Sequence, residues 1–139
     1  MLTTEQIAIG NTFFKGTLME TLGIELVQSA PGTVAATMAV EARTHQPMGS
    51  LHGGATVALA ESLGSTCSYL LVDAEKQAVV GIEVNANHIK SVRSGMVKAT
   101  GRLLHKGRAT HVWDIQVTND KNELVAVCRL TNLIIDRKP

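Results

Sequence analysis

A single carboxylate stands out in a long apolar segment of the chain. Residues 53–72 contain no proline and are rich in alanine and leucine, which predicts one helix of roughly 30 Å. Glu61 lies near its middle, and Ser65 and Ser68 follow at helical spacing, so the three residues form a polar stripe. An unpaired buried carboxylate is costly. The stripe therefore faces solvent or a basic residue, or Glu61 is a base or nucleophile in a partly dry cleft.

The residues that open this helix could stabilise a developing negative charge. His52, Gly53 and Gly54 stand at its start, where free N–H groups carry the positive end of the helix dipole. Two glycines allow a ligand to approach the backbone closely, so this terminus can polarise a carbonyl or hold an oxyanion. The alternative is a loop-to-helix junction that needs glycine, with His52 as a hydrogen-bonded residue at the helix start.

Positive charge is concentrated in one segment, although the chain is nearly neutral. The 139 residues carry 13 Lys and Arg against 12 Asp and Glu, which argues against a dedicated nucleic-acid binder. No acid lies between Val84 and Trp113. These charges are either solvated strand faces and turns or a surface for a polyanionic small molecule. The basic residues of this segment are Lys90, Arg93, Lys98, Arg102, Lys106 and Arg108.

Several other classes of protein are disfavoured by the sequence. The motifs GxSxG, GxGxxG, HExxH and CxxC do not occur, so we expect no serine-hydrolase elbow, no dinucleotide site and no metal. No apolar run approaches the length of a membrane-spanning helix, and the N-terminus lacks the pattern of a secretory signal. Cys67 and Cys128 are expected to be buried thiols in a reducing compartment, which predicts a cytoplasmic location.

The other elements are predicted to be strands that cover the helix. Apolar alternation and turn residues indicate strands at 24–29, 33–40, 79–88, 96–104, 111–118 and 124–135. Two short helices are expected before them, from Thr3 or Thr4 to about Ile9 and from Thr17 to Leu22. Short links favour antiparallel pairing of consecutive strands. We therefore predict a single α+β domain over residues 1–139, an antiparallel sheet of about six strands wrapped around one long central helix.

Three motifs around the helix resemble a known enzyme family. QPMGSLHGGA from Gln46, LAESLGS from Leu59 and VGIEVNANH from Val80 are similar to motifs of the hot-dog fold acyl-CoA thioesterases. The resemblance is to the branch of phenylacetate-pathway and 4-hydroxybenzoyl-CoA thioesterases. Within it, the chain looks like the subgroup of the 1,4-dihydroxy-2-naphthoyl-CoA hydrolase and the enterobactin-proofreading thioesterase. The resemblance covers about residues 18–135.

The resemblance implies a reaction and a role for each motif residue. A family member would hydrolyse an aryl-CoA or a short or medium acyl-CoA to free acid and CoA, with Glu61 as nucleophile or general base. The Gly53 amide would polarise the thioester carbonyl. Gln46 and His52 would position that carbonyl or the leaving thiolate, and Ser65 would orient the attacking water or the acyl group. The residues implied to hold CoA are Gly81, His88, Ile89, Lys90, Ser91, His105, Lys106, Gly107 and Arg108.

The resemblance also implies an assembly. Family members dimerise by joining their sheets and usually form tetramers, so we expect a homodimer that assembles into a homotetramer. The helix start of one copy would face the carboxylate of the other. CoA is part of the substrate, so no cofactor is expected, and neither is a nucleic-acid or membrane partner. The acyl group is left open, with its pocket expected near Met48, Val57, Tyr69, Phe13 and Phe14.

Two alternatives remain on the same fold. The first is a non-catalytic acyl-CoA-binding or regulatory protein, which we would expect to lack the carboxylate that Glu61 supplies here. The second is a hot-dog dehydratase, which uses a histidine in a different helix-start motif that this sequence does not contain. Measuring CoA release from a set of acyl-CoAs, and crotonyl-CoA hydration, would separate these functions.

Overall fold

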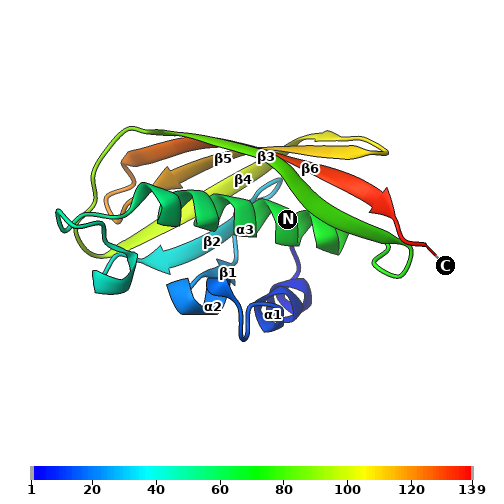
Figure 1. Ribbon diagram of the computed structural model, residues 1–139, viewed down its shortest axis with the longest axis horizontal. Coiled ribbons are helices and arrows are strands. Elements are labelled where there is room, and N and C mark those ends of the chain that lie inside the picture. Colours follow the sequence, from blue (N-terminus) through cyan, green and yellow to red (C-terminus); the bar gives the residue numbers. More distant parts are fainter. Residues whose placement is uncertain (1, 139) are drawn as a thin grey trace.

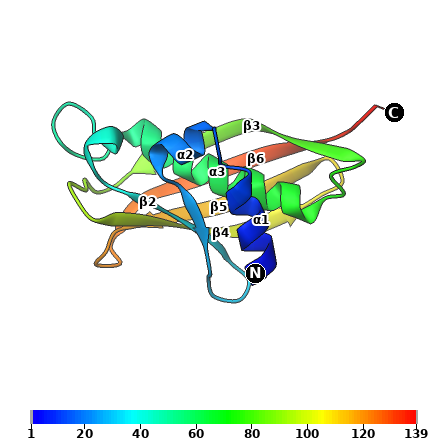
Figure 2. The ribbon, with the colours of Figure 1, turned by 90° about the horizontal axis from the view of Figure 1, so that it is seen from below.

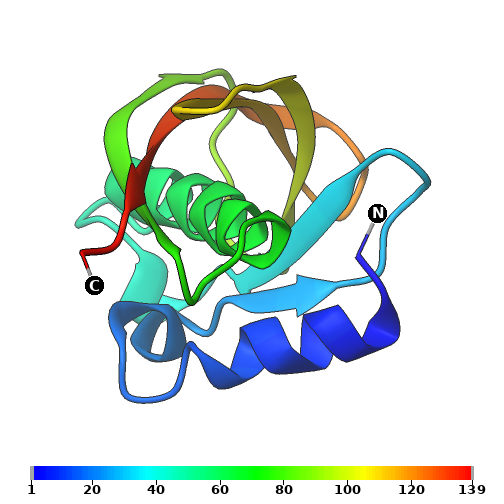
Figure 3. The ribbon, with the colours of Figure 1, turned by 90° about the vertical axis from the view of Figure 1, so that its right-hand side faces the viewer.

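A long helix and a curved sheet make up most of the protein. The computed structural model describes residues 2–138. The six strands form one antiparallel sheet that curves around α3 (Figure 3), so the predicted architecture is confirmed. In chain order the elements are α1 (Thr4–Thr12), α2 (Leu18–Leu22), β1 (Glu25–Val27), β2 (Val34–Ala39), the 3-10 turn η1 (Ala42–Thr44), α3 (Gly53–Leu71), β3 (Gln77–His88), β4 (Met96–Lys106), β5 (Thr110–Thr118) and β6 (Leu124–Asp136).

Local hydrogen bonds define where the helices begin and end. Thr3 caps α1 in a capping box, since Thr3 Oγ1 accepts from Gln6 N at 3.1 Å and Gln6 Oε1 accepts from Thr3 N at 2.9 Å. α2 ends at Gly23, whose φ of 71° is a conformation that glycine adopts readily. His52 caps α3. The three helices lie where the sequence predicts them, although α1 reaches Thr12, and both α1 and α2 pack against α3 (Figure 2).

The strand order differs from the predicted pairing of consecutive strands in one place. The order is β1-β2-β4-β5-β6-β3, so β3 pairs with β6 at the far edge and β4 pairs with β2. The expectation is wrong for β3 and β4, because the link between them is long enough to cross the sheet. Fully extended, residues 89–95 would span about 25 Å, more than the roughly 14 Å of three strand spacings.

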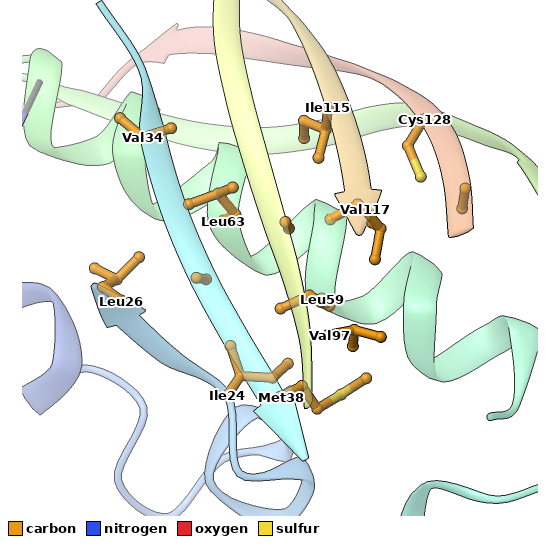
Figure 4. Close-up of a cluster of buried hydrophobic side chains, with 14 of the residues drawn as sticks. Ile24, Leu26, Val34, Met38, Leu59, Leu63, Val97, Ile115, Val117 and Cys128 are labelled. Carbon is orange, nitrogen blue, oxygen red and sulfur yellow. The ribbon is translucent and has the colours of Figure 1, made fainter. Parts of the chain in front are cut away.

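The concave side of the sheet and one face of α3 form the hydrophobic core. Cys67 of α3 and Cys128 of β6 belong to it as free thiols, which confirms the predicted buried cysteines. Burial raises their pKa values to about 12 and about 11, so both thiols are protonated and unreactive at neutral pH. The side chains that fill the core include Met38, Leu59, Leu63, Val97, Ile115 and Val117 (Figure 4).

One face of α3 is left partly uncovered, although its apolar composition predicts burial on all sides. Val57, Ala58 and Glu61 keep partial exposure because the sheet does not close and has β1 and β3 as its two edges. Edge strand β3 is long and apolar, with Val80 43% and Ile82 56% exposed. An edge of this kind is a template for pairing with another strand. None of the helices in residues 2–138 has the length and hydropathy needed to cross a membrane.

Candidate active site

The start of α3 forms one wall of a cavity of about 280 Å³. The cavity lies where β3 runs into the link to β4, at the left end of α3 in Figure 1. Residues from the loop before α3, from its first turn and from this link meet here. The structure therefore brings Gln46 and Gly53, which are predicted to act on the thioester carbonyl, together with residues 88–91, which are predicted to hold CoA. The lining residues include Gln46, Ser50, Gly53, Thr56, His88, Ile89, Lys90, Ser91 and Val125.

Gln46 and His52 are held by hydrogen bonds to near neighbours in the chain. Gln46 donates from Nε2 to Ser50 Oγ at 2.9 Å, and its Oε1 accepts from the Met48 amide. His52 Nδ1 accepts from Gly54 N at 2.7 Å, which confirms the expected hydrogen-bonded residue at the helix start. In the neutral ring the hydrogen therefore lies on Nε2. This Nε2 has no partner within residues 2–138, so it can donate to a ligand.

Gly53 offers a free backbone donor at the same place. The Gly54 N–H is occupied by His52, whereas the Gly53 N–H has no partner within the described residues. The imidazole of His88 lies close to this turn, because a methyl group on Gly53 would be 2.9 Å from His88 Nε2. A free N–H at the positive end of a helix of this length is suited to a carbonyl oxygen that gains negative charge.

Glu61 lies at a second place, about 12 Å further along α3. Its carboxylate packs against β3, where a side chain at Gly81 would clash with Glu61 Oε2 and lie 3.6 Å from Asn132 Oδ1. The residue is partly buried, and the four ion pairs found within residues 2–138 do not include it. A basic partner is therefore not seen there. An unpaired, partly buried carboxylate is suited to act as a base or a nucleophile.

Ser65, one turn after Glu61, is tied to strand β6 by a buried asparagine. Ser65 Oγ donates to Asn132 Oδ1 at 3.2 Å. Asn132 in turn donates from Nδ2 to Gly64 O at 3.3 Å and to Ser68 Oγ at 3.0 Å. Asn132 and Ser68 are fully buried, while Ser65 keeps partial exposure. The polar stripe of α3 is thus anchored to the sheet at Ser65 and Ser68.

Two residues of β5 complete this network. Trp113 Nε1 donates to Ser68 Oγ at 2.8 Å, and His111 Nδ1 lies 2.9 Å from the same oxygen. Both side chains are 2% exposed. Burial lowers the pKa of His111, and the positive charges of Lys106 and His105 lower it further. His111 is therefore neutral at physiological pH.

Sequence reasoning missed Asn132 and His111. Each occupies an inward position in an apolar strand: Asn132 continues the buried alternation of Cys128 and Leu130, and His111 precedes Trp113. A polar residue at an inward strand position must find a hydrogen-bond partner. This signal was present in the sequence, but it does not reveal which residues the partners are.

The predicted CoA-binding residues are divided between distant places in one chain. His88, Ile89, Lys90 and Ser91 line the cavity at the start of α3, and Lys90 forms an exposed ion pair with Glu123 at 3.1 Å. Gly81 instead faces Glu61. The turn formed by residues 105–108 joins β4 to β5 at the opposite end of the sheet, on the right in Figure 1. A single copy therefore does not gather these groups into one site.

The residues expected near the acyl group are also only partly brought together. Phe13 and Tyr69 contact each other edge to face, with ring centroids 5.3 Å apart. Phe14 is buried in the core, and Val57 keeps partial exposure. Met48 is 76% exposed in the loop before α3, at the other end of the helix from Tyr69.

A curved antiparallel sheet around one long helix is the hot-dog fold. The Thioesterase superfamily matches residues 48–126. The chain is 43% identical to the 1,4-dihydroxy-2-naphthoyl-CoA hydrolase of Escherichia coli, over 90% of this chain and 91% of that protein. It is 43% identical to the proofreading thioesterase EntH of Klebsiella pneumoniae, over 93% of each. The crystal structure of a mutant thioesterase from Pseudomonas aeruginosa aligns with a TM-score of 0.93, 44% identity and 97% coverage of both chains. This chain belongs to the thioesterase superfamily and is a thioester hydrolase.

Proposed function

We propose that the protein hydrolyses an acyl-CoA with an aryl or a short or medium acyl group to free acid and CoA. The observation that carries the proposal is Glu61, a carboxylate without an ion pair among the described residues 2–138, on the same helix as the Gly53 N–H, which has no partner among them either. The Escherichia coli relative is named for hydrolysis of such an aryl-CoA. CoA belongs to the substrate, so no cofactor takes part. The two buried free thiols fit a reducing compartment, and the cytoplasm is the proposed location.

The chemistry divides between the two places on α3. The thioester oxygen accepts from the Gly53 N–H, where the helix dipole stabilises the charge that develops on it. Gln46 and His52 position the carbonyl or the leaving sulfur. Glu61 either takes a proton from an attacking water or attacks the carbonyl carbon itself, in which case water hydrolyses the resulting anhydride. By either route the C–S bond breaks, the acyl carbon gains a water oxygen, and CoA leaves as the thiolate.

A dimer would bring these two places together. Gly53 and Glu61 lie about 12 Å apart in one chain, too far to act on one carbonyl. β3 runs alongside α3 with His88 next to Gly53 and Gly81 next to Glu61. Antiparallel pairing with the β3 of a second copy, centred midway between Gly81 and His88, would place Gly81 opposite His88 of the second copy. Glu61 of each copy would then face Gly53 of the other, which gives two sites per dimer.

The surface supports such a pairing. The β3 edge exposes Val80 and Ile82, and the neighbouring face of α3 keeps Val57 and Ala58 partly exposed. A second copy would cover both surfaces and pair the free backbone groups of the edge strand. We extend the proposal to a homotetramer of two such dimers, as in the family that the sequence motifs resemble.

The same pairing accounts for the divided positive charge. A two-fold axis across β3 exchanges the two ends of the sheet between the copies. Residues 105–108 of one copy would then lie at the same end of the dimer as His88 to Ser91 of the other. Lys90, Lys106 and Arg108 would offer charge to the phosphates of CoA at that end.

Replacing Glu61 tests the proposed reaction. Glu61→Gln keeps the shape of the side chain and removes its basicity, so turnover should fall about a thousandfold while the fold is kept. Glu75→Gln, at an exposed position after α3, is the matched control and should retain activity. Free thiol release is measured over aromatic, branched and linear acyl-CoAs. Unchanged turnover in Glu61→Gln would contradict the proposal.

A further inference from the structure

The structure assigns to Asn132 a positioning role: it fixes the direction of the hydrogen bond at Ser65, so that the Ser65 oxygen accepts from the attacking water. The inference rests on the proposed function, because it needs water to react beside Glu61. Asn132 itself contacts neither the thioester nor the water. Asn132 acts through Ser65, and its contribution follows from the chemistry of its own contacts.

The orientation of the Asn132 amide is set by the backbone of α3. The carbonyl oxygen of Gly64 can only accept, and the Asn132 group 3.3 Å from it must therefore be the NH₂. The second hydrogen of this NH₂ is donated to Ser68 Oγ at 3.0 Å. Oδ1 is consequently the atom that faces Ser65, at 3.2 Å. An amide oxygen has no hydrogen to give, so Ser65 must donate its own.

The hydrogen bonds around Ser68 prevent the Asn132 amide from rotating by half a turn. Ser68 Oγ accepts from Asn132 Nδ2 and from Trp113 Nε1, which uses both of its lone pairs. Its one hydrogen is then donated to His111 Nδ1 at 2.9 Å, which requires that nitrogen to be unprotonated. A flipped Asn132 would place Oδ1 against Gly64 O and leave Ser68 without its second donor. Such a buried, fully satisfied network has one arrangement.

This fixed orientation of Asn132 determines what Ser65, the partly exposed residue of the network, can do. With its hydrogen committed to Asn132, the Ser65 oxygen can only accept further hydrogen bonds. Glu61 lies one turn earlier on the same face of α3. A water between them would donate one hydrogen to Glu61 and the other to Ser65, which leaves a lone pair of the water for the acyl carbon. The arrangement serves either route, since water attacks the thioester in one and the anhydride in the other.

Asn132→Ala tests the role. Without Oδ1, the Ser65 hydroxyl is free to turn and donate to Glu61, which favours the ionised carboxylate and misdirects the water. We expect kcat to fall about tenfold or more with KM little changed. The acidic limb of the kcat–pH profile should move to lower pH, which a purely structural role would not cause. In a Ser65→Ala background, Asn132→Ala should have no further effect on kcat.

Two further variants separate positioning from stability. Leu26→Ala opens a cavity at β1, an edge strand four positions from β6 in the sheet, and should lower the melting temperature without changing the kcat–pH profile. If Asn132→Ala does not fold, Asn132→Thr replaces it, because threonine suits a strand and its hydroxyl is too short to reach Ser65 as Oδ1 does. Multiplicative losses in the Ser65/Asn132 double variant, or an unmoved acidic limb, would overturn the inference. A fully active Glu61→Gln would instead overturn the proposed function, and it would leave the Ser65/Asn132 coupling measurable on any thioester that is cleaved.

Discussion

The start and the middle of α3 both carry candidate chemistry, but they are built in different ways. At the start, the side chains of Gln46 and His52 bond to groups two to four residues away in the chain, and His52 is exposed. In the middle, Ser65 and Ser68 bond to buried side chains 43 to 67 residues away. Local bonds fix a binding surface that can adjust to a ligand, whereas the buried network holds the reacting groups in one arrangement. Changes at the start of α3 should therefore act mainly on substrate binding and on polarisation of the thioester carbonyl. Changes in the middle of α3 should act mainly on the chemical step.

Hybrid dimers test whether the two places work together across two copies. Gly53→Pro removes the free N–H, and proline is tolerated at the first position of a helix; the extended backbone of His52 also suits a following proline. Gly53→Pro and Glu61→Gln should each be nearly inactive. When the two variants are unfolded and refolded together, each hybrid should contain one intact site, so about a quarter of the activity should return for a two-fold dimer. Failure to recover activity in verified hybrid dimers would contradict a site shared between copies.

Gly81→Ala is expected to have the next largest effect, and within one copy it acts on Glu61 in the middle of the helix. The added methyl group would clash with the Glu61 carboxylate, and displacing a catalytic group by about 1 Å costs on the order of a hundredfold in kcat. Gly53→Ala is the matched variant at the helix start. It keeps the N–H, and its methyl group meets the end of the His88 side chain, so kcat should fall less than about tenfold. Equal losses in the two variants would remove the distinction between the two places.

The difference between local and distant contacts also explains what could be predicted from the sequence. The helix start, Glu61 and the strands are predictable because glycine pairs, capping residues and apolar alternation act over a few neighbouring residues. Glu61 is conspicuous since it interrupts an apolar run. The alternation in β6 likewise identifies Asn132 as an inward polar residue, although its partners on α3 and β5 depend on how the sheet closes over the helix.

Three features could not be obtained in this way. The position of β3 at the sheet edge depends on where the link 89–95 crosses, and no local pattern specifies that. The distance between Gly53 and Glu61 follows from helix geometry, but the edge strand through which a second copy could bring them together is seen only in the folded chain. The turn at residues 105–108 and Lys90 belong to opposite ends of one chain, which a list of basic residues does not reveal.

Lys90→Ala should have a smaller effect, confined to binding at the helix start. We expect KM for acyl-CoA to rise about tenfold. KM for the corresponding acyl-pantetheine, a substrate that lacks the nucleotide part of CoA, should change little. The melting temperature should hardly move, because the ion pair with Glu123 is exposed. Glu123→Gln is the matched control: it frees Lys90 from its partner and should leave KM unchanged or lower it. Equal effects of Lys90→Ala on both substrates would show that Lys90 does not contact the nucleotide.

The smallest expected effect is a dependence of stability on pH that comes from the buried network. Burial, with Lys106 and His105, holds the pKa of His111 below the ordinary value of 6.5, so the unfolded chain binds a proton at this residue more readily than the folded one. Its stabilising contribution is complete above pH 6.5 and is lost as the pH falls from there through the lower folded-state pKa, by at most about 1.4 kcal/mol per pH unit. A proton on Nδ1 would also face Ser68 Oγ, whose lone pairs are already used. Urea unfolding at fixed protein concentration between pH 7 and 5 should show a steeper loss for the unmodified protein than for His111→Gln, whereas parallel curves would mean that the network tolerates a charged His111.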